Sequence, residues 1–137
     1  LPKLSSTGLA NNLLVAAVEL MSESEFVAAE AYLRECLAIR EKTQPDVWTT
    51  FNTQSLLGGA LLGQKNYADA EPLLRKGYEG MRAREKTIPP EGIARVTAAL
   101  DRLIALSTAV GKPDDVTKWQ AERAKYPNAA PMPGEKK

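Results

Sequence analysis

Acidic side chains and a single cysteine are the residues of this 137-residue chain whose types could support chemistry. Two nearby carboxylates can act as general acid and general base. The chain has three such pairs: Glu23 with Glu25, Glu30 with Glu35, and Asp114 with Asp115. Each pair falls at an expected helix start or on an expected polar helix face, where carboxylates stabilise the helix by a few tenths to about 1 kcal/mol. We therefore interpret the pairs as parts of solvated helix surfaces.

Nucleophile and metal chemistry lack their usual residues in this sequence. The chain contains no histidine, the commonest general base and metal ligand. Cys36 cannot form an internal disulfide, and it follows Leu33 by three residues, where a small buried residue is expected. The glycines are scattered, and none opens a strand–loop–helix that could hold a phosphate. The sequence predicts a protein that is not an enzyme and that binds no metal or cofactor.

Composition and charge limit the partners of the chain. Hydrophobic residues make up 44% and charged residues 26%, as in a soluble globular protein. The formal net charge is +1, and the basic residues alternate with acidic ones, so we expect no nucleic-acid partner. No apolar run is long enough to cross a bilayer, and signal-peptide features are absent, which favours a cytoplasmic location without membrane binding. Because the chain begins at Leu1, we expect a processed product or a piece of a longer protein.

A short motif occurs twice, 41 residues apart, in segments 25–34 (EFVAAEAYLR) and 66–75 (NYADAEPLLR). Such periods indicate stacked units that bury their apolar faces against one another, and arrays of this kind present surfaces to partners. The matched positions hold an aromatic residue, alanine, glutamate, leucine and arginine: Phe26/Tyr67, Ala29/Ala70, Glu30/Glu71, Leu33/Leu74 and Arg34/Arg75.

Helical periodicity continues along the chain and predicts an all-α fold. Apolar residues recur every three or four positions, and prolines interrupt the pattern. The expected helices are 8–22, 24–42, 47–62, 67–86, 91–110 and 114–125, and short connections join them into three antiparallel hairpins. From residue 127 the chain has no packable face, and we expect a disordered tail over 127–137.

Local signals predict where these helices begin and end. Serine, threonine, asparagine and aspartate accept hydrogen bonds from the first turn of a helix, and glycine favours a left-handed end. The predicted N-caps are one of residues 5–7 for the first helix, Ser22 or Ser24 for the second helix, Asp46 for the third helix and Asn66 for the fourth helix. Gly63 is predicted to end the third helix in a left-handed conformation.

The middle unit resembles a tetratricopeptide repeat, whose pattern has a Leu-Gly pair in the first helix and a spaced alanine in the second. Leu57-Gly58 and Leu61 match the first helix, and Tyr67 and Ala70 match the second, together with Leu74. The first unit matches less fully, with Ala16-Ala17, Leu20, Phe26, Ala29 and Leu33. The third unit, shifted by 46, is degenerate, with Leu103-Ile104, Pro113 and Val116.

The resemblance implies a right-handed α-solenoid in residues 1–126, with repeats at about 8–42, 46–86 and 90–126 and a capping last repeat. The long spacing is similar to repeats of the kinesin-light-chain type. Segments 51–63, 67–74 and 77–81 also resemble the repeat region at the C-terminal end of large bacterial serine/threonine protein kinases. No kinase signature is present. The resemblance implies a non-catalytic interaction scaffold of a signalling protein, with a protein or peptide as its partner.

In tetratricopeptide arrays the first helices of the hairpins line a concave groove. Asn11 and Asn52 lie 41 residues apart, and an asparagine could grip the backbone of an extended peptide. The alternative is that both asparagines only decorate helix starts. Carried onto this sequence, the groove residues are Asn11, Leu14, Val18 and Met21, then Asn52, Ser55, Gly59 and Leu62, and finally Ala98, Asp101 and Ala105.

The first expected helix is apolar on nearly all sides, whereas a helix that buries one face needs only one apolar stripe. Its apolar residues are Leu13, Leu14, Val15, Ala16, Ala17, Val18, Leu20 and Met21. We expect its remaining surface to contact an upstream repeat, a second copy of the chain or a ligand helix. The alternative function is therefore a structural repeat protein that assembles into dimers or filaments through this helix.

Overall fold

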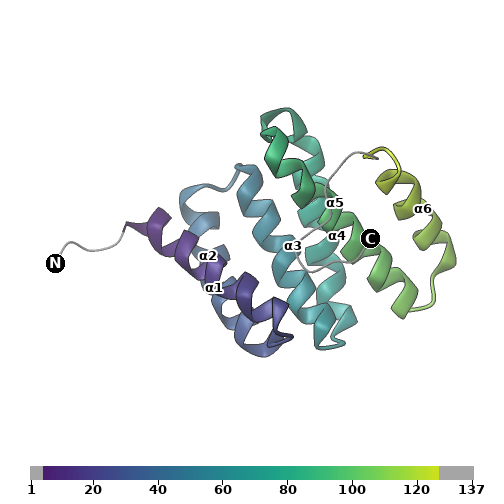
Figure 1. Cartoon of the computed structure of the whole chain (residues 1–137), viewed down its shortest axis with the longest axis horizontal. Coiled ribbons are helices and arrows are strands. Elements are labelled where there is room, and N and C mark those ends of the chain that lie inside the picture. The colour runs from purple at the N-terminus through teal and green to yellow at the C-terminus, as the bar shows by residue number, and fades with distance from the viewer. Residues whose placement is uncertain (1–4, 127–137) are drawn as a thin grey trace.

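The computed structural model describes residues 5–126, and the regular elements within this range are all helices (Figure 1). The expectation of an all-α fold is confirmed. The predicted tail at 127–137 lies outside the described residues. The helices are α1 (Ser6–Ser22), α2 (Phe26–Thr43), α3 (Trp48–Gly63), α4 (Tyr67–Ala83), α5 (Ile93–Ala109) and α6 (Pro113–Arg123), with short 3-10 turns at Glu85–Thr87 and Pro90–Gly92.

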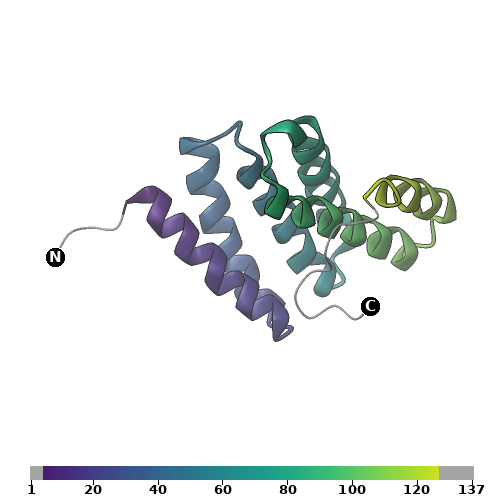
Figure 2. The same cartoon turned by 45° about the horizontal axis from the view of Figure 1, so that its top comes forward.

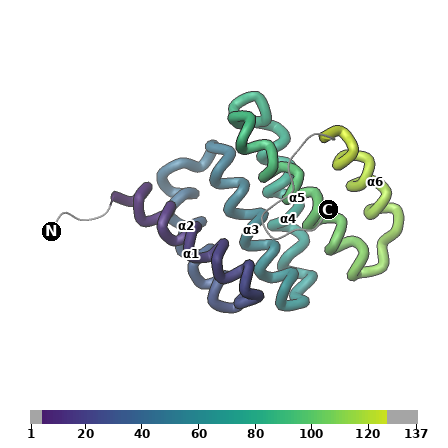
Figure 3. Tube along the Cα trace, viewed as in Figure 1, coloured from purple at the N-terminus to yellow at the C-terminus, as the bar shows by residue number. Residues whose placement is uncertain are grey.

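The helices lie next to one another in chain order, from α1 at one end of the molecule to α6 at the other (Figures 2 and 3). Each helix packs against the next one in the sequence. The most extensive contacts are those of α3 with α4 and of α1 with α2. Helix α3 also packs against α2 and α5, so it has neighbours on several sides. This central position explains why α3 is buried along most of its length.

The connections α1–α2, α3–α4 and α5–α6 share one turn geometry. The middle residue of each is left-handed: Ser24 at φ 60°, Lys65 at φ 62° and Gly111 at φ 72°. These positions are 41 and 46 residues apart, the same shifts that align the three units in sequence. In each turn the next N–H donates to a carbonyl of the preceding helix, as in a Schellman ending. These bonds are Glu25–Leu20 at 2.8 Å, Asn66–Leu61 at 2.9 Å and Lys112–Ser107 at 2.9 Å.

This turn corrects two sequence predictions. Gly63 is not the left-handed stop of α3, because it is the last helical residue and Lys65 takes the positive φ. A Cβ on Gly63 would lie 2.5 Å from the ring of Phe26, so glycine serves packing there. Neither Ser22 nor Ser24 caps α2, which begins after Glu25 without a side-chain cap. Ser22 instead donates to the Glu19 carbonyl, and Ser24 forms the turn.

The other helix ends agree in part with the sequence predictions. Ser5 and Asn66 cap α1 and α4 as expected, by accepting hydrogen bonds from Gly8 and Asp69. Asp46 does not cap α3, which starts after Val47. Helix α4 ends at Ala83 and not at residue 86, because the chain continues into a 3-10 turn.

The core lies along the seams between helices. Ala29 and Ala70, the alanines of the repeated motif, are fully buried, as a close interhelical contact requires. Cys36 is also fully buried, so its interpretation as a core residue is confirmed. Helices α3 and α4 approach each other closely at Gly77, where a Cβ would lie 2.7 Å from the backbone nitrogen of Ser55.

Candidate functional site

A groove of about 560 Å³ lies across α1, α3 and α5. It brings together most of the residues that the sequence predicts for a binding surface. From that set it contains Leu14, Val18 and Met21 of α1, Asn52 and Leu62 of α3, and Ala98, Asp101 and Ala105 of α5. The predicted residues Asn11, Ser55 and Gly59 are not among the groove-lining residues.

Helical spacing explains why these side chains meet in one groove. Residues three and four apart lie on the same face of a helix. Leu14, Val18 and Met21 follow this spacing on α1. On α5, Ala98 and Ala105 lie two turns apart and leave space above the helix because their side chains are short. The result is a mainly apolar surface with a few polar groups among its lining residues.

Asn52 is the unusual polar residue of this groove. It is only 6% exposed, and its Oδ1 has no hydrogen-bond partner within residues 5–126. A buried acceptor without a partner costs about 1–3 kcal/mol, and native proteins contain few of them. Such a group requires an explanation, and a ligand that donates one hydrogen bond would supply the missing partner.

The three predicted residues outside the groove have internal partners. Asn11 accepts a hydrogen bond at 2.8 Å from Nη2 of Arg40. Ser55 is buried, and its Oγ accepts one at 2.9 Å from Nη1 of Arg102. Gly59 lies beneath side chains, since a Cβ there would be 3.1 Å from Arg102 and from Met21. These three residues therefore do not line the groove.

Asn11 and Asn52 differ in environment although they occupy equivalent repeat positions. Asn52 is buried because α3 packs against α2, α4 and α5. Asn11 is exposed, and of the helices in the described structure α1 packs mainly on α2. The surroundings of a residue, and not its repeat position alone, decide whether its side chain reaches the groove.

Five further residues line the groove that the sequence analysis does not predict for a binding surface: Glu19, Ser22, Leu56, Arg95 and Arg102. Leu56 follows Asn52 by four residues, so helical spacing alone could have identified it. Charges of both signs lie at the rim. Asp101 forms an ion pair with Arg123 of α6 at 3.1 Å, which connects the groove to the last helix.

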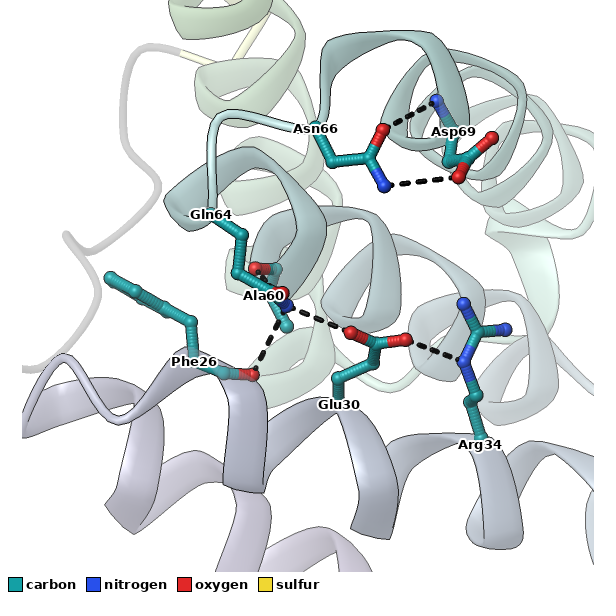
Figure 4. A network of polar contacts seen from close by, with 7 residues as sticks. All are labelled: Phe26, Glu30, Arg34, Ala60, Gln64, Asn66 and Asp69. Atoms are coloured by element: carbon teal, nitrogen blue, oxygen red, sulfur yellow. Dashed lines mark hydrogen bonds and ion pairs between the residues drawn. The ribbon is translucent and has the colours of Figure 1, made fainter.

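The repeated motif holds the first two hairpins together (Figure 4). Nε2 of Gln64 donates to Oε1 of Glu30 at 2.9 Å and to the carbonyl of Ala60 at 3.2 Å. Arg34 donates to the other oxygen of Glu30 at 2.7 Å. The hydrogen bond from Gln64, followed by that from Arg34, holds the pKa of Glu30 below its ordinary value. Glu30 is thus a structural link between α2 and α3.

A second cavity, of about 470 Å³, lies between α4, α5 and α6. Three of its charged groups have neighbouring partners: Glu71 pairs with Arg75 at 3.0 Å, and Lys118 lies over the ring of Trp119 at 4.5 Å. The cavity therefore offers a less distinctive binding site than the groove, where a buried acceptor has no partner.

Clusters of three or more residues suited to holding a metal ion do not occur within residues 5–126. None of the helices in this range combines the length and apolar character that crossing a bilayer requires. No protein-family model matches the chain, and a search of curated proteins finds no relative.

Proposed function

We propose that this protein is a non-catalytic interaction module whose groove across α1, α3 and α5 binds an extended protein segment. In this proposal the helices form three tetratricopeptide-type hairpins of a right-handed solenoid, and the third is a degenerate cap. The shared left-handed turn at Ser24, Lys65 and Gly111 supports the three-unit reading, because it follows the same shifts as the sequence motif.

The unpartnered Oδ1 of Asn52 is the observation that carries this proposal. An extended peptide has a free backbone N–H every second residue, and one of these can donate to Asn52. The apolar groove then accepts the adjacent side chains of the peptide. Its volume of about 560 Å³ lies in the range of known ligand sites, about 300 to 1,000 Å³.

The resemblance to bacterial kinase repeat regions suggests the setting of this module. We infer a C-terminal interaction region of a larger, cytoplasmic bacterial signalling protein. The partner is then a protein or peptide, and neither nucleic acid nor membrane is needed. The near-neutral net charge of +1 agrees with this choice of partner.

Selection from a displayed library of random peptides tests the groove directly. The full chain should enrich peptides with spaced apolar residues. Val18→Asp places a charge in the groove at a residue that is 42% exposed, so the fold should tolerate it. We expect selected peptides to bind this variant at least about tenfold more weakly, because a charge would face their apolar side chains.

Val27→Asp is the matched control for this experiment. Val27 is 71% exposed on α2 and does not line the groove. Peptides selected on the unmodified chain should bind this variant with unchanged affinity. Three outcomes would count against the groove as the binding site. The selected peptides could lose the same affinity for Val18→Asp and Val27→Asp, they could bind both variants as well as the unmodified chain, or the selection could enrich no peptides.

A specific observation supports self-assembly as a second candidate function. Helix α1 exposes several apolar side chains, of which Val15 is 62% exposed. Burying one such side chain contributes about 1.5–3 kcal/mol before the costs of association. In this alternative a second copy covers α1, giving dimers or filaments. The exposed large apolar residues of the first hairpin are Leu9, Val15, Val18, Val27 and Tyr32.

A further inference from the structure

The two outer walls of the groove differ in charge. Helix α1 belongs to a stretch, residues 5–33, that contains four glutamates and neither lysine nor arginine. Of these four, Glu19 lines the groove. On the opposite wall, α5 contributes Arg95 and Arg102, and the carboxylate of Asp101 is paired with an arginine of α6. The groove is therefore acidic along α1 and basic along α5, although the formal net charge of the chain is only +1.

Glu19 is an exposed residue whose carboxylate the fold leaves available. Its backbone carbonyl accepts a hydrogen bond from Ser22 Oγ, but its carboxylate forms neither a hydrogen bond nor an ion pair with residues 5–126. The position is unfavourable for α1 itself, because the C-terminal end of a helix carries partial negative charge and favours a cation. The last turn of α1 contains no basic residue. A cation from a partner would interact favourably with both the carboxylate and the helix end.

The two walls approach each other above α3. A Cβ on Gly59 would lie 3.1 Å from the terminal methyl group of Met21 on α1, and equally close to Cδ and Nε of Arg102 on α5. A segment that lies above α3 is thus within side-chain reach of both walls. Neighbouring side chains of an extended chain point in opposite directions, so one such segment presents side chains to α1 and α5 at the same time.

The charges of the walls decide where this segment can carry a cation. Nη1 of Arg102 donates to Ser55 Oγ at 2.9 Å, and Ser55 follows Asn52 by one helical turn. A cation beside Asn52 would therefore meet Arg102, so a neutral backbone N–H is the better donor to the Asn52 acceptor. Opposite charges fix the orientation of a partner, and like charges exclude the wrong one. The α1 wall favours a basic side chain and rejects an acidic one.

We propose that the groove selects a partner segment with a lysine or arginine that pairs with Glu19, beside apolar side chains that fill the groove. The basic residue sets the orientation of the segment, since its cation faces α1 and not the arginines of α5. This inference rests on the proposed peptide-binding role of the groove, and it specifies the chemistry of the partner.

Selection of displayed random peptides on the full chain tests this chemistry. We expect the enriched peptides to share a lysine or arginine at a constant spacing from their apolar residues. Glu19→Lys should weaken their binding at least about tenfold, because an attractive pair becomes a repulsive one. The variant should fold, since lysine is favourable in the last turn of a helix. A new selection on Glu19→Lys should enrich aspartate or glutamate at the same peptide position.

Glu35→Lys is the matched control, because it changes the net charge of the chain by the same amount. Glu35 is exposed on α2 and does not line the groove. Its replacement should change the affinity less than about twofold, since salt screens exposed charges that lie far from the peptide. The loss caused by Glu19→Lys should itself become smaller as the salt concentration rises.

Fluorescence polarisation separates this inference from the groove function. Peptides that bind Asn52→Leu more weakly, but bind Glu19→Lys as well as the unmodified chain, would refute the pair with Glu19 while the groove function stands. Enriched peptides without a shared basic position would refute it in the same way. An equal loss for Glu19→Lys and Glu35→Lys would reduce the effect to net charge and overturn the inference. If the selection enriches no peptide, the groove function fails and this inference fails with it.

Discussion

Arg40 and Asn52 are two polar residues that are about equally buried. They differ in whether their side chains find hydrogen-bond partners. Arg40 donates to Thr53 Oγ1 at 2.9 Å and to Asn11 Oδ1 at 2.8 Å, so it connects α2 with α1 and α3. Asn52 leaves its acceptor without a partner in the described part of the chain. Arg40 is thus a structural residue, whereas the unsatisfied Asn52 is suited to a ligand.

Replacing Asn52 should separate stability from binding. Asn52→Leu removes the unsatisfied buried acceptor, and we expect the free energy of unfolding to rise by about 1 kcal/mol. Binding of selected peptides should weaken about tenfold, because the hydrogen bond from the peptide backbone is lost. Urea denaturation and fluorescence polarisation measure the two effects. Asn12→Leu, at an exposed position of α1, should change neither quantity. A destabilised Asn52→Leu protein would contradict this view of Asn52.

Removing the guanidinium of Arg40 should be costly. Arg40→Ala leaves acceptors on Asn11 and Thr53 without their donor and opens a cavity, so we expect the free energy of unfolding to fall by about 3 kcal/mol. Arg34→Ala is the control, because the Arg34 side chain is 54% exposed and its ion pair with Glu30 should contribute less than about 1 kcal/mol. Similar losses in the two variants, measured by urea denaturation, would refute the structural role of Arg40.

At the scale of elements, the left-handed turns of the hairpins carry strain in two of three cases. Ser24 and Lys65 adopt positive φ with side chains, whereas Gly111 does so without one. A left-handed conformation costs a residue with a side chain about 1–2 kcal/mol. We expect Lys65→Gly and Ser24→Gly each to raise the free energy of unfolding by about 1 kcal/mol.

Gly111→Ala provides the reciprocal test of the same turn. No other group lies within 4 Å of the position that its Cβ would take, so the change adds backbone strain without a clash. Thermal unfolding should show a loss of about 1 kcal/mol. A gain in stability in Gly111→Ala, or a loss in Lys65→Gly, would show that the turns relax to another conformation.

The attachment of α6 should depend on pH through Tyr126. Burial, together with the hydrogen bond to Glu85 and the charge of that carboxylate, raises the pKa of Tyr126 above its ordinary value. The folded state therefore holds the phenolic proton more tightly than the unfolded state. The resulting stabilisation is fully present below the unfolded pKa of about 10, and it is lost as the pH rises above that value.

Tyr126→Phe removes this group and tests the effect. The free energy of unfolding at pH 8 should fall by about 1 kcal/mol, because the hydrogen bond to Glu85 is lost. Between pH 9 and 11 the variant should lose stability less steeply than the unmodified chain. Tyr32→Phe, at an exposed position of α2, should keep the original slope. Identical slopes in all three proteins would disprove the contribution of Tyr126.

At the scale of the whole molecule, the two ends differ. Helix α1 exposes large apolar side chains, whereas the outer residues of α6 are mainly polar. If a second copy covers α1, light scattering at increasing protein concentration should show dimers or larger assemblies. Val15→Glu should then shift the protein toward monomers, since it places a charge on the contact surface. A monomer at all concentrations would exclude assembly through α1.

The sequence by itself determined the helices, the repeat spacing and most residues of the groove. Helical periodicity and the paired motif are local features, and they correctly placed Ala29 and Ala70 in the seams. The three-residue and four-residue spacing also placed Leu14, Val18 and Met21 on one face of α1. These features could be predicted because the geometry of one helix fixes which side chains share a face.

Only the tertiary structure decided which residues of other helices each helix face contacts. Asn11 and Asn52 are equivalent in the repeat, yet Asn11 bonds to Arg40 while Asn52 remains an unpartnered acceptor in the groove. Gly63 has the signature of a helix stop, but the ring of Phe26 needs its space. Burial and hydrogen-bond partners come from helices distant in the sequence, and a local pattern contains no information about those neighbours.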